Sequence, residues 1–156
     1  MKRMHINLTT ADLPRSVAFY SELFDHEPTV LKADYAKWSL EDPRVNFSLS
    51  THGDKPGLDH LGIEAGEPAE FESLRARLRD SANDVFEQPD VSCCYANSSK
   101  AWVRDPNDVA WETFITHGAN TTYGDGTVER AEAADEPAIA SACCATVEEK
   151  SGSCCV

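Results

Sequence analysis

The chain has 156 residues and a formal net charge of -13. Such an acidic balance argues against nucleic-acid binding, because that binding depends on neutralising phosphates with lysine and arginine. No apolar run approaches membrane-spanning length, and the N-terminus lacks the apolar stretch of a signal peptide. We therefore expect a cytoplasmic protein with no membrane partner and no nucleic-acid partner.

The first 51 residues predict one strand, one helix and three short strands. Residues 4–10 alternate apolar and polar side chains, as a half-buried strand does. Asp12 is a suitable helix N-cap, and Pro14 is tolerated in a first turn. Apolar side chains at helical spacing follow, namely Leu13, Val17, Tyr20 and Phe24. The three strands are expected over residues 27–33, 35–41 and 44–51.

The second half has the same order of elements. Residues 58–65 predict a strand, and residues 67–83 predict a helix with Phe71, Leu74 and Leu78 on its apolar face. The short strands that follow are expected over residues 84–88, 91–97, 100–105 and 109–116.

The two halves align without a gap at an offset of 55 residues, which places His5 on His60. We therefore predict an α+β fold of two paired βαβββ modules over residues 1–117, with a cleft between the modules. Because the modules can pair within one chain or swap between copies, a monomer and a homodimer both stay open. Residues 118–156 are rich in small and acidic residues, with Tyr123 as their one aromatic, which predicts a flexible acidic tail.

Three side chains in this plan indicate a metal site. His5 and His60 occupy the same place in the two leading strands, and Glu112 lies among apolar neighbours in the last strand. A buried carboxylate is costly unless it is paired or bound to a cation. Its counterpart in the first half is Ser48, so the set has three ligands and open positions. Non-haem Fe(II) oxygenases use two histidines and one carboxylate, but three-ligand zinc hydrolases use the same residue types.

The six cysteines form three adjacent pairs. These pairs are Cys93–Cys94, Cys143–Cys144 and Cys154–Cys155. Their spacing fits neither a secreted disulfide framework nor a C-x-x-C zinc site. In a reducing cytosol they would be free thiols, available to a soft ligand.

Three stretches, ADLPRSVAFYSELF, LDHLGIEA and DPNDVAWETF, resemble the vicinal oxygen chelate superfamily, which includes glyoxalase I, bleomycin-resistance proteins and extradiol dioxygenases. The resemblance covers roughly residues 3–117. A narrower resemblance, carried by CCYA together with LDHLG and WETF, is to the ArsI-type C–As lyases and the cadmium-induced proteins of the CadI type.

This resemblance implies an Fe(II) ion on His5, His60 and Glu112, and a trivalent organoarsenical on Cys93 and Cys94. The implied reaction is cleavage of the carbon–arsenic bond by O2, with arsenite as a product. Neighbouring side chains of a strand point to opposite faces. We therefore expect a strand end or bulge, next to a turn over residues 97–99, to bring the two thiols together.

Several alternatives stay open. The protein could be a non-catalytic thiol protein that binds Cd(II) or arsenite, or another glyoxalase-like metalloenzyme. Cys93 as a nucleophile activated by histidine is disfavoured, since no histidine is near it in sequence. The tail pairs Cys143–Cys144 and Cys154–Cys155 are candidate accessory thiols. We interpret Tyr95, Lys100 and Trp102 as packing or surface groups.

Overall fold

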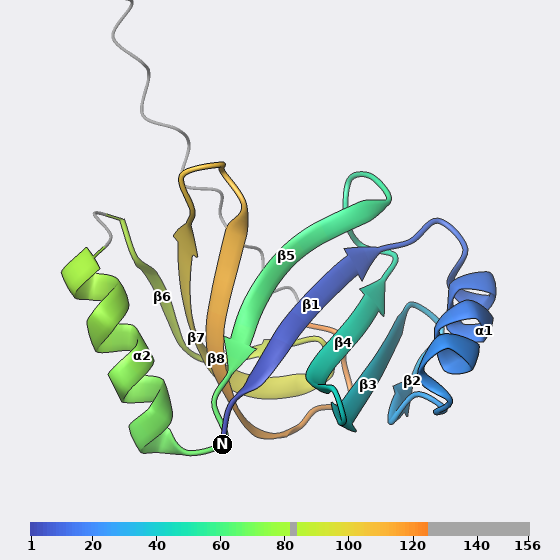
Figure 1. The fold of residues 1–156 in the computed structure, drawn as a ribbon, viewed down its shortest axis with the longest axis horizontal. Coiled ribbons are helices and arrows are strands. Elements are labelled where there is room, and N and C mark those ends of the chain that lie inside the picture. Colours follow the sequence, from blue (N-terminus) through green and yellow to red (C-terminus); the bar gives the residue numbers. More distant parts are fainter. Residues whose placement is uncertain (82–83, 125–156) are drawn as a thin grey trace, which may run out of the picture. The chain divides into compact units, whose positions relative to one another are not determined.

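The computed structural model describes residues 1–81 and 84–124, and Figure 1 shows the arrangement of their elements. The first module contains β1 (Arg3–Thr9), α1 (Leu13–Phe24), β2 (Val30–Leu31), β3 (Tyr35–Glu41) and β4 (Arg44–Ser50). The second contains β5 (Gly57–Glu64), α2 (Pro68–Ser81), β6 (Phe86–Cys93), β7 (Ala96–Arg104) and β8 (Ala110–Ala119). The predicted α+β fold of two βαβββ modules is therefore confirmed.

The two modules share one curled, mixed sheet with the strand order β2-β3-β4-β1-β5-β8-β7-β6. Within each module the leading strand pairs in parallel with the last one, β1 with β4 and β5 with β8. The modules join through the antiparallel pair of β1 and β5 (Figure 1). The two leading strands therefore lie side by side at the centre of the sheet.

The first helix covers the apolar face of its own module. It begins where the sequence predicts, because the Asp12 carboxylate accepts a hydrogen bond from the backbone N–H of Arg15. Its apolar side chains pack against the core of β3 and β4. That cluster contains Leu13, Val17, Tyr20 and Phe24 of the helix and Trp38, Phe47 and Leu49 of the strands.

The second helix packs in the same way on the other module, where Phe71 and Leu74 meet Ile115 of β8. The opposite face of the sheet centre is polar but also buried. Residues paired in register share a face of the sheet. The buried polar pairs of β1 and β4 are His5 with Asn46, Asn7 with Ser48 and Thr9 with Ser50. The helices therefore leave the polar face free to form a site.

A tight hairpin joins β6 to β7, and it corrects two sequence predictions. The strand predicted over residues 91–97 is interrupted, because β6 ends at Cys93 and β7 begins at Ala96. The two linking residues, Cys94 and Tyr95, have positive φ angles of 55° and 61°. This is the backbone of a type I′ turn. The turn predicted over residues 97–99 is wrong, because those residues lie within β7.

The predicted domain end at residue 117 lies inside β8, which continues to Ala119. The remainder of the predicted tail, from residue 125, lies outside the described residues, as do Cys143, Cys144, Cys154 and Cys155. Among the residues that the structure describes, no helix is long and apolar enough to cross a membrane.

Candidate active site

Three side chains from the central strands converge on the polar face of the sheet. His5 comes from β1, His60 from β5 and Glu112 from β8. The two Nε2 atoms are 3.1 Å apart, and each lies 3.5 to 3.6 Å from Oε2 of Glu112. One ligand atom of each residue lies within 4.8 Å of the others. The structure thus brings the three predicted ligands together.

The other nitrogen of each imidazole has an oxygen partner. Nδ1 of His5 lies 3.0 Å from the backbone oxygen of Asn46. Nδ1 of His60 lies 2.6 Å from Oδ2 of Asp59, and the same oxygen accepts a hydrogen bond from the Asn7 amide at 3.2 Å. Because these oxygens are acceptors, each Nδ1 carries the hydrogen. In the neutral form of the two rings, both Nε2 lone pairs then point at the same place.

This arrangement fits a metal ion. Two Nε2 lone pairs and the Oε2 of Glu112 are electron-pair donors that repel at these distances unless a cation or a proton lies among them. Histidine ligands of metals commonly donate their other N–H to a carboxylate or a carbonyl oxygen, as His60 and His5 do here. Two nitrogens and one oxygen suit divalent iron and zinc, among other transition metals.

Burial and neighbouring charges shift the pKa values of the three side chains in different directions. Burial lowers the pKa of His5 to about 4. Burial also lowers the pKa of His60, but its hydrogen bonds with Asp59 and Glu112 outweigh this effect and raise the pKa to about 9. Burial raises the pKa of Glu112, but Lys100 and the imidazoles hold it well below the usual range. The site therefore favours an ionised carboxylate, ready to bind a cation.

A buried lysine supports this carboxylate. Nζ of Lys100, on β7, lies 2.5 Å from Oε1 of Glu112, and both side chains are almost fully buried. The ammonium also lies 5.7 Å from the ring centre of Trp102 and 5.9 Å from that of Phe114. The interpretation of Lys100 as a packing or surface group is therefore wrong. Its ion pair holds Oε1 and leaves Oε2 toward the imidazoles.

The two hairpin cysteines lie next to this cluster. Both are free thiols, and their sulfur atoms are 3.2 Å apart because the turn redirects the chain between them. Lys100, which is paired with Glu112, also lies within hydrogen-bonding reach of Cys93. The predicted thiol pair and the predicted metal ligands are therefore on the same side of the sheet, with Lys100 between them.

The two thiols differ in acidity. The hydrogen bond from Cys94 lowers the pKa of Cys93 to about 6, with help from the nearby Lys100 and against the effect of burial. The same hydrogen bond and burial raise the pKa of Cys94. One thiolate and one thiol, in contact with each other, are thus present near neutral pH. A thiolate is the form of cysteine that binds soft ions.

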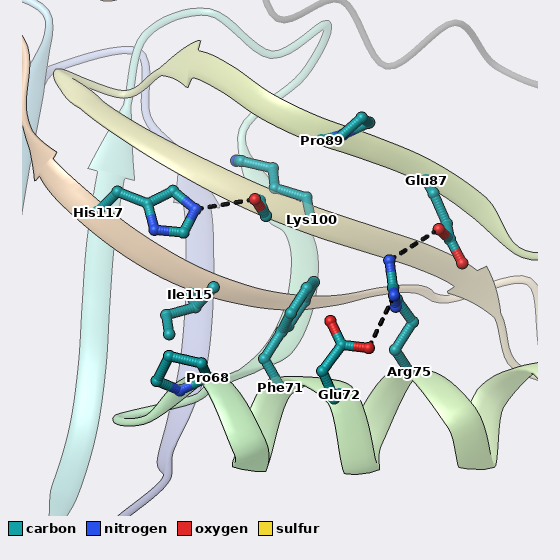
Figure 2. Close-up of a pocket in the computed structure, with 10 residues that line it drawn as sticks. Pro68, Phe71, Glu72, Arg75, Glu87, Pro89, Lys100, Ile115 and His117 are labelled. Carbon is teal, nitrogen blue, oxygen red and sulfur yellow. Dashed lines mark hydrogen bonds and ion pairs between the residues drawn. The ribbon is translucent and has the colours of Figure 1, made fainter.

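A separate cavity of about 170 Å³ lies between α2 and the strands β6, β7 and β8. Figure 2 shows Phe71 and Ile115 pointing into it, and Arg75 held between Glu72 and Glu87. Of its lining residues, only Lys100 also belongs to the site described above. The cavity is therefore not the place where the imidazoles and thiols meet.

Comparison with known proteins identifies relatives along most of the chain, although no family model matches it. A trivalent organoarsenical cleaving enzyme of Bacillus sp. (strain MD1) is 38% identical over 121 residues, which are 74% of each chain. A protein of the same name from Thermomonospora curvata is 33% identical over 76% of this chain and 80% of its own. The cadmium-induced protein CadI of Mycobacterium tuberculosis is 32% identical over 81% of this chain and 84% of its own.

Solved structures share the fold at low sequence identity. A homoprotocatechuate 2,3-dioxygenase from Arthrobacter globiformis has a TM-score of 0.55 and 17% identity, covering 76% of this chain and 37% of that one. A Mn(II)-bound glyoxalase from Novosphingobium aromaticivorans has a TM-score of 0.54 and 18% identity, covering 80% and 44%. The chain therefore belongs to the family of the trivalent organoarsenical cleaving enzymes and the CadI proteins, and it has the fold of the vicinal oxygen chelate proteins.

Proposed function

We propose that the protein is an Fe(II)-dependent dioxygenase that cleaves the carbon–arsenic bond of trivalent organoarsenicals in arsenic detoxification. Its substrates would be methylarsenite and trivalent aromatic arsenicals. Its products would be arsenite and the organic group, which leaves arsenic as an oxidised fragment. The observation that carries the proposal is the link through Lys100 between Glu112 and Cys93, which joins a metal-ligand cluster to a thiol pair. Relatives that are 33% to 38% identical are named as trivalent organoarsenical cleaving enzymes.

The thiol pair suits the arsenic atom of such a substrate. Trivalent arsenic is soft and favours thiolate ligands, and an organoarsenical of this class has two positions that exchange for sulfur. Sulfur atoms 3.2 Å apart on Cys93 and Cys94 can bind one arsenic atom together. The organic group is then the one remaining substituent on arsenic, held by the carbon–arsenic bond. Binding at both sulfurs fixes the substrate beside the metal ligands, and such proximity supplies much of a rate enhancement.

His5, His60 and Glu112 would hold the metal, and ferrous iron bound there would supply the activation of O2. The chain itself orients these ligands, because Asp59 and the Asn46 carbonyl fix the two imidazole rings. Apolar rings limit the access of water, since Phe114 packs edge-on against His5 and Trp102 edge-on against His60, with ring centres 5.1 and 5.0 Å apart.

The test begins with metal-free protein, loaded with Fe(II) under anaerobic conditions. Methylarsenite and then O2 are added, and arsenic species are separated by chromatography. We expect arsenite to appear only when metal and O2 are both present, and to be lost in Cys93→Ser. Arsenite no higher than in the metal-free control would rule out the proposal.

A second candidate function is thiol-based binding of Cd(II) or arsenite without turnover, favoured by the similarity to cadmium-induced CadI proteins. This function needs Cys93 and Cys94 but not the metal ligands. A further glyoxalase-like reaction is less well supported, since Ser48 stands where a fourth ligand would be needed. The cytoplasmic location and the choice between monomer and homodimer stay predictions.

A further inference from the structure

Residues 120–124, here called the closing segment, follow β8 and return to the β6–β7 hairpin. The backbone N–H of Asn120 donates to the backbone oxygen of Tyr95 at 2.7 Å. At the other end, Gly124 has a φ of 79°, and a Cβ atom there would lie 2.0 Å from the Ser92 oxygen. The segment thus contacts the turn and also the strand end that leads to Cys93.

Tyr123, in the middle of the closing segment, packs into a group of rings next to Cys94. Its ring centre lies 6.0 Å from that of Tyr35 and 5.8 Å from that of Tyr95, and it stacks on His52 at 3.9 Å. Its hydroxyl lies within hydrogen-bonding reach of Cys94. Burial and then this neighbouring sulfur raise the pKa of Tyr123, so the phenol keeps its proton and acts as the donor.

The turn needs such support from outside. Cys94 and Tyr95 both have positive φ, and a residue with a side chain is disfavoured there by roughly 1–2 kcal/mol. Turns of this type normally use asparagine, aspartate or glycine. A backbone of this kind persists only where its surroundings hold it in place. Contacts from the closing segment and from the ring group provide that support.

We propose that Tyr123 is a positioning residue for the thiol pair. Its ring holds the turn, and its hydroxyl holds the sulfur of Cys94 where it can share one soft ion with Cys93. The sequence places Tyr123 in the predicted tail, so no local pattern connects it with the cysteines. The identity of the soft ion as arsenic rests on the proposed function, whereas the positioning itself is independent of turnover.

The test uses the full chain with Cys143, Cys144, Cys154 and Cys155 replaced by serine, so that Cys93 and Cys94 are the remaining thiols. Phenylarsine oxide is the probe, and its dissociation constant is measured by competition with a soluble dithiol. Tyr123→Phe keeps the ring and removes the hydroxyl. We expect it to weaken binding roughly tenfold, as the loss of a hydrogen bond to a charged or polarised partner does.

Two further variants separate the hydroxyl from the ring. Tyr20→Phe, on α1 in the core at the other face of the sheet, is the matched control and should bind as the parent does. Tyr123→Leu should bind more weakly than Tyr123→Phe, while Tyr123→Phe should unfold at the same urea concentration as the parent. If the ring of Tyr123 has a purely structural role, Tyr123→Phe should bind the probe with full affinity. That result would overturn the positioning role.

The same experiment distinguishes this inference from the proposed function. Binding that is equal in the parent and in Tyr123→Phe, but lost in Cys93→Ser, overturns the role of Tyr123 alone. Binding by the parent that does not depend on Cys93 overturns both. Weaker binding in Tyr123→Phe, with no arsenite formed by the iron-loaded parent, supports the positioning role and rejects the cleavage reaction.

Discussion

The two modules have the same elements in the same order, but they contribute unequally to the site. Each supplies one imidazole from its leading strand, His5 from β1 and His60 from β5. The carboxylate, the buried lysine and the two thiols all come from the second module. The repeated plan therefore accounts for the symmetric part of the site, and the differences between the two modules account for its chemical groups.

The strand register shows where the modules diverge. Two residues beyond its histidine, the first module pairs Asn7 with Ser48, and the second pairs Gly62 with Glu112. The Ser48 hydroxyl donates to the Asn7 side chain at 2.8 Å, so this pair satisfies itself. A Cβ atom at Gly62 would lie 2.4 Å from the Glu112 backbone oxygen, so only glycine fits there. This difference leaves a single carboxylate next to the two imidazoles.

The largest expected effect comes from removing that carboxylate. Glu112→Gln keeps the shape and a partner for Lys100 but takes away the charge. We expect turnover to fall to background. This loss is larger than the roughly 100-fold loss that follows from substituting a residue that hydrogen-bonds to a metal ligand. Iron content should fall with it, whereas arsenical binding at the cysteines should persist. The control is Ser48→Ala, the counterpart change in the first module, which should retain turnover. If cells that express Glu112→Gln and cells that express Ser48→Ala survive soft-metal exposure equally well, that result would favour the sequestering function.

The next effect concerns the buried lysine. Lys100→Met leaves the Glu112 carboxylate buried without its ammonium, and breaking a buried ion pair by removing one partner costs about 3–5 kcal/mol. Urea unfolding of the metal-free protein measures this loss. Lys37→Met is the matched change on the first module, where the side chain is half-exposed, and should stay within about 0.5 kcal/mol. A similar small loss for both variants would mean that the lysine of the second module is not a structural ion-pair partner.

The two symmetric imidazoles are also predicted to have different pKa values, one below and one above the ordinary value of histidine. In the metal-free protein, burial lowers the pKa of His5 to about 4, while Asp59 and Glu112 overcome burial and raise that of His60 to about 9. NMR titration of the imidazole carbons measures both values. Two midpoints near 6.5 would show that the modules surround their histidines alike.

The sign of the accompanying stability change follows from the raised pKa of His60. Its contribution to folding is fully present below pH 6.5 and is lost as the pH rises through about 9, on the order of 3 kcal/mol. Urea unfolding at several pH values should show this loss when Cys93 and Cys94 are replaced by serine. The cysteines must be replaced because the pKa of Cys93 is lower in the folded than in the unfolded protein. Ionisation of Cys93 therefore adds stability as the pH rises between these two pKa values, which opposes the loss from His60.

The repeated plan could be predicted from sequence because it rests on local and periodic signals. Alternation in β1, the Asp12 cap and the spacing of apolar residues each act over a few positions, and the offset of 55 residues relates His5 to His60. The histidine pair of the candidate site followed from that relation, whereas Glu112 followed from its place among apolar neighbours in the last strand. Lys100 could not be identified in this way, because its burial depends on an ion pair with Glu112 on a neighbouring strand.

The hairpin could not be predicted for a related reason. Cys94 and Tyr95 are not turn formers, so the residues gave no signal for a type I′ turn, whereas the polar residues 97–99 gave a misleading one. Support for the turn comes from Tyr123, which lies far along the chain in a stretch of tail-like composition. Contacts between distant segments override local propensity here.

The smallest predicted effect concerns the partners that orient the two imidazoles, which again differ between the modules. His5 is oriented by a backbone oxygen, that of Asn46, but His60 by a side chain, that of Asp59. Asp59→Asn should therefore lower metal affinity by about 10- to 100-fold, because an outer carboxylate sets the tautomer and the basicity of its histidine. Asn46→Ala keeps the carbonyl and should leave the affinity unchanged. Competition with a metal-sensitive dye measures both constants. Equal losses in the two variants would show that burial of the imidazoles, rather than their orientation, sets the affinity.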